Sequence, residues 1–259
     1  MNEFGGGLKA RTILMAAVLV ALTAGCGSRD EIFGNTGGAG GGLAAGTCSV
    51  PGTPLDMGAA ANFGVLVGPT ASATLTNNGI ATLVNGDVGA AVQTTPPAQG
   101  AGFNNYTGTD APFVAAKAAM LTAIGCAAGR ACDFNYGAAT DFATVVGLAP
   151  GVHCVAGAMS VGSNLILSTP GVYIFLSSGD LTSANTINLT FGGTANATNT
   201  ALFWVPTGAA SIGTDNAFLG TIMPDASAAT TLGANTTLLP GRAFSDSAVT
   251  LDTNQITIP

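Results

Sequence analysis

The side chains that most often carry acid–base or nucleophilic chemistry are sparse in this chain. His153 is the only histidine, and it stands beside Cys154. A Ser/His/Asp triad cannot be built without it, and we expect it to have a structural role at a corner of the fold. The aspartates are single and widely spaced. Asp180 and Asp252 could share a face, but several repeats apart, so a glycosidase-like carboxylate pair is unsupported. We therefore expect no catalytic residues and no enzyme activity.

The cysteines predict disulfides and no metal site. Cys26 follows an apolar run, whereas Cys48, Cys126, Cys132 and Cys154 are spread over the remaining chain. None has metal-ligand spacing with a histidine, so we expect neither a metal nor a cofactor. In an exported domain, four cysteines favour disulfides, with three possible connectivities. We favour Cys132–Cys154, because both flank the segment that leaves the predicted helix, and Cys48–Cys126 by elimination. Free buried thiols are the alternative.

The N-terminus has the organisation of an export signal. Lys9 and Arg11 precede an apolar run over 12–24, which ends just before Cys26. This arrangement resembles a bacterial lipoprotein signal, in which the cysteine is lipidated, although Thr23 stands where an aliphatic residue is usual. Plain secretion is the alternative. We expect a signal peptide over 1–25, a flexible Gly-rich tether over 26–47, and one domain over 48–259. The protein is then an outer-membrane or cell-surface lipoprotein, or otherwise secreted.

Composition indicates an all-β domain with an uncharged surface. The chain has 38 glycines, and only 7% of its residues are charged, against roughly 25% in an average soluble domain. From Cys26 onward, the chain has four basic and twelve acidic side chains. Four scattered cations cannot neutralise a phosphate backbone, so we expect no nucleic-acid partner. We expect a monomer.

One stretch is predicted to be helical. Asp110 is a suitable N-cap, Pro112 suits the first turn, and Gly129 follows an Ala-rich run. The expected buried face of this helix comprises Phe113, Ala116, Met120, Leu121 and Ile124. The apolar run from Phe203 to Val205 is expected to pack against the helix and to bury Trp204 between helix and strands.

After this helix, strand-forming sequence returns at a regular pitch. Residues 203–220, 221–241 and 242–259 can be aligned, and each contains a small polar residue, an aliphatic residue, and Gly or Asp. A period of about 18 to 22 residues indicates a solenoid; a β-sandwich with similar hairpin spacing is the alternative. The triplets, including two looser copies, are Ser160-Val161-Gly162, Asp180-Leu181-Thr182, Ser211-Ile212-Gly213, Thr231-Leu232-Gly233 and Thr250-Leu251-Asp252.

The aligned triplets predict three columns of side chains, because successive residues of a strand point to opposite faces. The aliphatic residues at the centre of each triplet should point inward. The two outward columns are Ser160, Asp180, Ser211, Thr231 and Thr250, and Gly162, Thr182, Gly213, Gly233 and Asp252.

Several segments together resemble the ice-binding-protein-like family of microbial antifreeze proteins. No single motif is specific, but their order along the chain is. The resemblance implies a right-handed, discontinuous β-helix of triangular section, with the α-helix packed along one face, and it implies ice binding. The segments that carry it are residues 55–66, 84–89, 128–130, 148–153, 168–175, 202–205, 218–222, 240–243 and 248–256.

The expected ligand is an ice surface. Coils of a solenoid stack about 4.8 Å apart, and residues i and i+2 of a strand lie about 6.7 Å apart. A flat grid of hydroxyl and methyl groups at these spacings can order water as in ice, although threonine is also a common exposed strand residue without any such role. The alternative function is a non-catalytic adhesive or structural lipoprotein that binds polysaccharide or protein. The candidate ice-binding residues are Ser160, Thr182, Ser211, Thr231 and Thr250.

Overall fold

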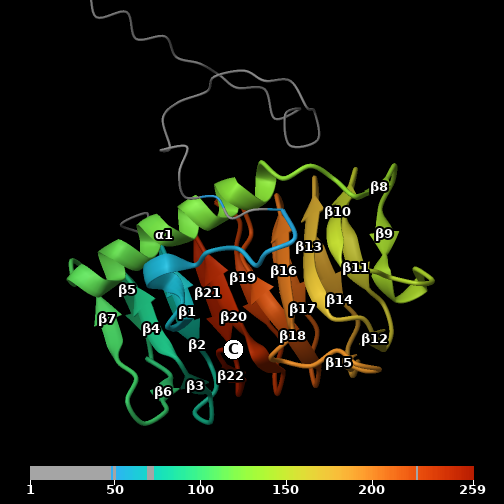
Figure 1. Cartoon of the computed structure of the whole chain (residues 1–259). Helices are drawn as coiled ribbons and strands as arrows, with labels where there is room; N and C mark the ends of the chain where they lie inside the picture. The colour runs from blue at the N-terminus through green and yellow to red at the C-terminus, as the bar shows by residue number, and fades with distance from the viewer. Residues whose placement is uncertain (1–47, 49–50, 69–72, 226) are drawn as a thin grey trace, which may run out of the picture.

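The computed structural model describes residues 48, 51–68, 73–225 and 227–259. The signal peptide, the tether and Cys26 lie outside these residues. The described chain forms a β-helix with three faces and one long α-helix beside it (Figure 1). The solenoid prediction is therefore correct, and the β-sandwich alternative is wrong, since all strand pairs in the described residues are parallel.

The first face lies against the α-helix, and we call it the helix-side face. Two of its strands, β18 and β20, begin on another face and bend around a corner, where Gly220 adopts a positive φ of 99°. In stacking order, the helix-side face comprises β7 (Asn105–Thr107), β4 (Asp87–Ala90), β1 (Phe63–Val67), the second part of β20 (Thr237–Ser245), the second part of β18 (Ala217–Ile222), β16 (Thr200–Pro206), β13 (Gly171–Ser177), β10 (Gly151–Val155) and β8 (Phe134–Tyr136).

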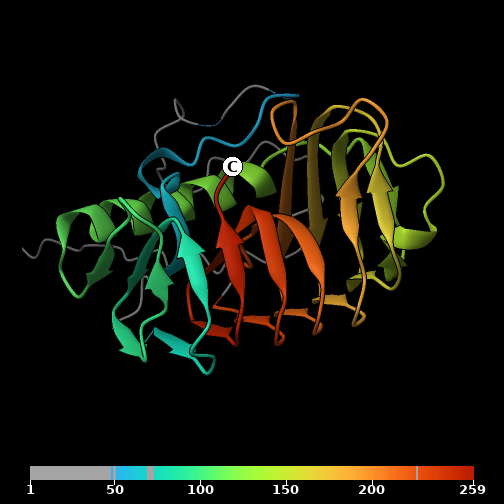
Figure 2. The same cartoon turned by 90° about the horizontal axis from the view of Figure 1, so that it is seen from below.

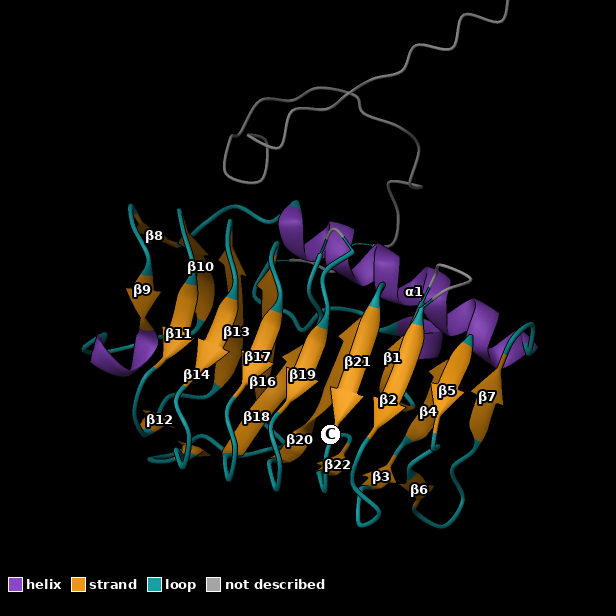
Figure 3. Cartoon of the chain, turned by 180° about the vertical axis from the view of Figure 1, so that it is seen from behind, coloured by secondary structure: helices purple, strands orange, loops and turns teal. Residues whose placement is uncertain are grey.

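The second face is a separate parallel sheet of eight strands, which we call the hydroxyl face. Figure 3 shows these strands side by side, with the α-helix at their upper edge and not across them. In stacking order they are β5 (Val92–Thr94), β2 (Thr74–Asn77), β21 (Ala248–Leu251), β19 (Thr230–Leu232), β17 (Ala210–Ile212), β14 (Leu181–Ser183), β11 (Met159–Val161) and β9 (Thr140–Asp141).

The third face completes the triangle. It includes the first parts of β18 and β20, and a bridge from Asn188 to Ala217 joins β15 to β18. Its remaining strands are β6 (Ala98–Gln99), β3 (Leu83–Asn85), β22 (Gln255–Thr257), β15 (Leu189–Phe191) and β12 (Leu165–Leu167). Two short 3-10 helices, η2 (Gly58–Ala60) and η3 (Phe142–Thr144), precede β1 and follow β9.

The order of the coils in space differs from their order in the sequence. β1 pairs with β20, and β2 pairs with β21, so the first coil of the chain stacks on the last. Figure 2 shows the teal strands of the early coils beside the red strands of the C-terminal coil. The β-helix is therefore discontinuous, as the family resemblance implied.

The helix α1 (Ala111–Ala128) packs along the helix-side face, with Asp110 as N-cap residue and Gly129 as C-cap residue. It is long and apolar enough to cross a membrane by length and composition alone, but Phe113 and Met120 are fully buried against the β-helix. Leu121, expected on the buried face, is instead 40% exposed. Its position falls on the flank of the buried stripe, which the smaller Ala116 and Ala123 occupy at close range to the strands.

Two separate apolar cores lie on opposite sides of the helix-side face. The larger core fills the interior of the β-helix, and the smaller one lies between this face and α1. Phe203 and Val205 point to α1, whereas Trp204 points to the interior and its ring stacks on Phe175 at 4.3 Å. The expectation that Trp204 lies between helix and strands is thus wrong, because alternation along β16 sends it to the opposite side from its neighbours.

A ladder of buried polar side chains holds the corner between the hydroxyl face and the third face. Asn216 donates from Nδ2 to the carbonyl oxygen of Ala184 at 2.8 Å, and its Oδ1 accepts from the backbone N–H of Ile187 at 2.8 Å. Asn254, two coils further along the stack, likewise donates from Nδ2 to the carbonyl oxygen of Gly233 at 2.8 Å. These bonds satisfy backbone groups that leave the sheet ladder at a sharp turn, and they fix the edge of the hydroxyl face.

Candidate functional site

One column of hydroxyl-bearing side chains follows the centre of the hydroxyl face. Strand pairing places its members directly opposite one another in adjacent coils, and all are exposed or half-buried. Their hydroxyls make no hydrogen bond to any residue that the structure describes, so they are available to water. In stacking order the column is Thr94, Thr76, Thr250, Thr231, Ser211, Thr182 and Ser160. Asp141 follows Ser160 at the end.

Around Ser211 and Thr231, small residues flank the column. Ala209 and Ala229 precede Ser211 and Thr231 by two residues, on the same side of their strands. On the other flank, a Cβ added to Gly233 would lie 2.6 Å from the backbone of the preceding coil at Gly213. The close stacking of these two coils therefore excludes a side chain at Gly233, whereas Asn78 and Asp252 occupy the equivalent position beside Thr76 and Thr250.

All five candidate residues from the sequence fall into this single column, but the alignment that produced them was wrong in one coil. Leu181 pairs with Met159 and not with Val161, a shift of two residues. A shift of two keeps the leucine inward, but it places Thr182 in the column where Asp180 was expected. Asp180 instead stands at the corner before β14, where its Oδ1 accepts from the backbone N–H of Ala209 at 2.9 Å.

Two further members, Thr76 and Thr94, were missed from the sequence. Both lie in the early coils, before α1, and reach the column only because β2 stacks on β21. The segment 73–76 reads as a strand, but the local sequence does not reveal which coil lies next to it. With both residues, the column runs through seven coils, roughly 29 Å at about 4.8 Å per coil.

His153 is buried in a structural role, as expected, but it lies within the strand β10 and not at a corner of the fold. It is 1% exposed, and it lies between the rings of Phe134 and Phe175, with centroids at 4.6 and 4.9 Å. Its Nδ1 lies 3.0 Å from the hydroxyl oxygen of Tyr136, and its Nε2 lies 2.9 Å from Ala149 O. Burial lowers the pKa of His153, outweighing the hydrogen bond to Ala149 and the charge of Asp133, which both raise it. The imidazole is therefore a neutral member of the interior aromatic stack and has no access to a substrate.

Asp180 and Asp252 do not form a pair. Asp180 precedes β14 and Asp252 follows β21, so they lie at opposite edges of the hydroxyl face with β17 and β19 between their coils. Among the described residues, no group of three or more His, Cys, Asp or Glu side chains could hold a metal ion.

Two disulfides staple the helix region to the rest of the fold. Cys132 is bonded to Cys154 and Cys48 to Cys126, which are the favoured pairings. The first bond joins the segment after α1 to β10. The second joins the start of the described chain to the last turn of α1. Both bonds lie at the C-terminal end of α1, so they fix the point where the chain leaves the helix.

A discontinuous β-helix with one accessory helix and a flat, uncharged row of Thr and Ser defines a class of solenoid that binds an extended surface. Comparison with known proteins identifies the family. The family model described as Ice-binding-like matches residues 70–257, and this chain belongs to that family.

Relatives and solved structures agree with this assignment. The chain is 30% identical over 228 residues to an ice-binding protein of Flavobacterium frigoris (strain PS1), covering 79% of this chain and 76% of the relative. Among solved structures, an ice binding protein from an Antarctic biological consortium matches with a TM-score of 0.67 and 26% identity, over 81% of this chain and 93% of that one. The ice-binding protein of the ascomycete Antarctomyces psychrotrophicus matches with a TM-score of 0.66 and 25% identity, over 80% and 99%.

Proposed function

We propose that this protein binds ice through the hydroxyl face. The observation that carries the proposal is the column of seven Thr and Ser side chains, in register from Ser160 to Thr94, none of which bonds to the described part of the protein. The ice-binding names of the relatives support it. The proposed face includes Ser160, Thr182, Ser211, Thr231 and Thr250, together with Thr76 and Thr94.

The physical basis is a match between a rigid grid and an ordered layer of water. The threonine methyl groups exclude disordered water, and the hydroxyls anchor molecules at the coil spacing of about 4.8 Å. Each contact is weak, so binding requires many of them at once, which a flat and rigid face provides. In the coils of Ser211 and Thr231, alanine and glycine flanks keep the surface level, and the stacked interior core keeps it rigid.

The test compares one exposed threonine on each of two faces. Thr231→Tyr places a ring above the hydroxyl column, whereas Thr190→Tyr makes the same change on the third face, where Thr190 is also exposed in a strand. We expect Thr231→Tyr to abolish shaping of a single ice crystal just below its melting point, and Thr190→Tyr to leave it intact. Both variants should retain wild-type stability within about 0.5 kcal/mol, because the substitutions are exposed.

The outcomes separate the proposal from its alternatives. If Thr190→Tyr abolished ice shaping and Thr231→Tyr did not, the ice-binding site would lie on the third face. A wild-type protein that has no effect on ice would favour an adhesive protein that binds polysaccharide or protein. Catalysis forms no part of the proposed function, because the one histidine is buried in the aromatic stack.

We also propose that the protein is a monomer held at the outer membrane or cell surface by a lipid on Cys26, with secretion as the alternative. The N-terminal sequence supports the lipid anchor, and Gly27 after the cysteine favours the outer membrane of a two-membrane bacterium. Cys48, where the described chain begins, is bonded to Cys126 on α1. An anchor upstream of Cys48 would therefore attach beside α1 and leave the hydroxyl face uncovered (Figure 3).

Mass spectrometry of the mature N-terminus tests the anchor. We expect a diacylated or triacylated cysteine at position 26. An unmodified terminus at another residue would contradict lipidation and leave ice binding by a secreted protein unaffected. Light scattering of the detergent-free domain after removal of the lipidated segment tests the monomer, for which we expect a single mass close to that of one chain.

A further inference from the structure

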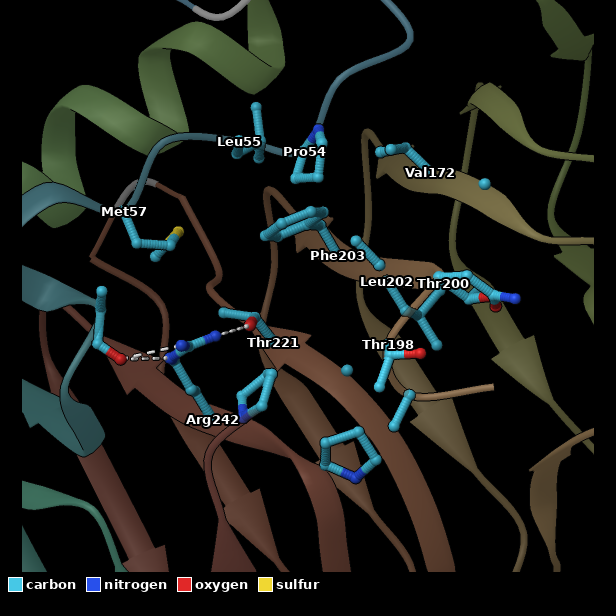
Figure 4. A pocket seen from close by; sticks show the side chains of 18 of the residues that line it. Pro54, Leu55, Met57, Val172, Thr198, Thr200, Leu202, Phe203, Thr221 and Arg242 are labelled. Carbon is cyan, nitrogen blue, oxygen red and sulfur yellow. Dashed lines mark hydrogen bonds between the residues drawn. The ribbon is translucent and has the colours of Figure 1, made fainter. Parts of the chain in front are cut away.

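A cavity of about 580 Å³ lies on the helix-side face, away from the hydroxyl face. Its roof is the segment that precedes η2, and its floor is formed by the strands β13, β16, β18 and β20 (Figure 4). Most of the wall is apolar. A few polar side chains interrupt it, namely Asp56, Thr198, Asn199, Thr200, Thr221 and Arg242. The apolar residues include Pro54, Leu55, Met57, Val172, Leu202 and Phe203.

Arg242 is the one cationic side chain of this wall, and it is only 8% exposed. Its Nε and Nη2 donate to the carbonyl oxygen of Ala61 at 3.2 and 2.8 Å, and its Nη1 donates to Thr221 Oγ1 at 3.3 Å. A guanidinium has five N–H donors, so one N–H on each terminal nitrogen has no partner in the described residues. These bonds hold the guanidinium between Ala61, which directly follows η2, and Thr221 on β18 (Figure 4).

The charge of Arg242 is not neutralised by any described residue. Burial lowers its pKa to about 10, and no neighbouring charge opposes that effect. The group is therefore still cationic at neutral pH. Asp56 also borders the cavity, but its carboxylate accepts from the backbone N–H of Gly58 at 2.8 Å. Buried charges in proteins are normally paired, and this one faces a cavity instead.

We propose that the cavity binds a small organic carboxylate with a short aliphatic body, held by Arg242. The carboxylate would accept the two remaining N–H groups on Nη1 and Nη2, in the paired geometry that guanidinium and carboxylate adopt. The aliphatic body would contact Met57, Leu202 and Phe203. This site lies on a different face from the proposed ice-binding column and does not depend on ice binding.

The composition of the wall excludes other ligand classes. A divalent cation would meet the uncompensated positive charge of Arg242, and one rim carboxylate is too few for a metal site. A sugar would need many more hydrogen-bonding side chains than the Thr residues here, two of which, Thr198 and Thr200, already bond to Asn196 and Asn199.

The test uses the mature chain above 0 °C, without ice, and hexanoate as probe. Hexanol and hexylammonium have the same aliphatic body without the negative charge. By calorimetric titration we expect hexanoate to bind with a dissociation constant on the order of a millimolar, as for a ligand of this size. Binding should be at least about tenfold tighter than that of hexanol, and Arg242→Gln should remove this difference.

A second variant keeps the proposal testable if Arg242→Gln does not fold. Val172→Trp fills the cavity from β13 and leaves Arg242 intact, so it should abolish hexanoate binding. Ile166→Trp is the matched control, since Ile166 is 60% exposed on the third face, outside the cavity. The proposal is overturned if hexanoate shows no saturable binding, if hexanol binds equally well, or if Val172→Trp and Ile166→Trp bind hexanoate alike.

Discussion

Replacement of Trp204 by alanine should cost more stability than replacement of an exposed threonine on the hydroxyl face. The indole is fully buried in the interior core, with ring centroids at 4.3 Å from Phe175, 5.5 Å from Phe218 and 6.3 Å from Phe142. Its Nε1–H donates to Leu219 O at 2.9 Å. Removal of a buried aromatic side chain costs about 3–5 kcal/mol, and a buried carbonyl left unpaired adds about 1 kcal/mol.

We therefore expect Trp204→Ala to lower the free energy of unfolding by about 4–6 kcal/mol. Guanidinium denaturation followed by far-ultraviolet circular dichroism measures this loss, since Trp204 is the only tryptophan and its fluorescence disappears with it. Trp204→Phe keeps one aromatic ring in the stack, so its loss should be roughly half as large. A loss below about 2 kcal/mol for Trp204→Ala would refute the view that the stack forms the interior core.

A double-mutant cycle distinguishes the two sides of β16. Trp204 and Phe175 share the interior, so their alanine variants should show a coupling energy of about 0.5–1.5 kcal/mol. Met120 lies on α1, across the strand, in the other core. The coupling of Trp204 to Met120 should be within about 0.5 kcal/mol of zero. A strong coupling energy between Trp204 and Met120, with none between Trp204 and Phe175, would instead place Trp204 at the interface with α1.

Three further predictions concern the ends and edges of the fold. Burial lowers the pKa of His153 from its ordinary value of 6.5 in the folded protein, whereas the unfolded imidazole keeps a pKa of about 6.5. The contribution of His153 to stability is therefore complete above about pH 6.5 and decreases as the pH falls below it. The thermal midpoint should drop between pH 7 and pH 5, and it should drop less in His153→Phe. Removal of the Cys132–Cys154 bond, which spans 22 residues, with Cys132→Ser and Cys154→Ser should cost about 3 kcal/mol by the loop-entropy estimate, measured by denaturation; no change in midpoint would contradict it. Gly233→Val should roughen the hydroxyl face and force adjacent coils apart, because its Cβ would lie 2.6 Å from Gly213 C. Ice shaping and thermal stability should therefore fall together. Retention of either property would indicate that the coils can move apart to accommodate the side chain.

Sequence reasoning predicted the repeat and the inward and outward alternation, because both depend on local periodicity. Ser211, Thr231 and Thr250 could be aligned correctly since β17, β19 and β21 follow one another at a nearly constant interval. Thr182 was placed in the wrong column, although it was retained as a candidate. β14 has Ser183 at the position that pairs with Val161, so the triplet pattern centred on Leu181 instead. Such a shift of two residues leaves every inward residue inward, and the pattern cannot detect it.

Other features depend on contacts between distant segments and had no local signal. The position of Trp204 is one case: its neighbours Phe203 and Val205 are equally apolar, and only the pairing of β16 with β13 decides which side each residue faces. The cavity at Arg242 is another. It forms where the segment before η2 crosses β13, β16, β18 and β20, and Arg242 bonds to Ala61, 181 residues earlier in the chain, so this partner of the guanidinium could not be anticipated.

The discontinuous order of the coils also explains why the protein has a long helix. After β7, at one end of the stack, the chain must return to the other end to begin β8, and eight strand spacings of about 4.8 Å separate these strands, roughly 38 Å. The 18 residues of α1 span about 27 Å as a helix, and the segment before β8 supplies the remainder. This return places the final coil against the first, which joins Thr250 to Thr76 and makes one continuous hydroxyl column from two parts of the sequence. The helix and its two disulfides are therefore expected to matter for ice binding at a distance, because any loosening of the return would separate the coils that the column joins.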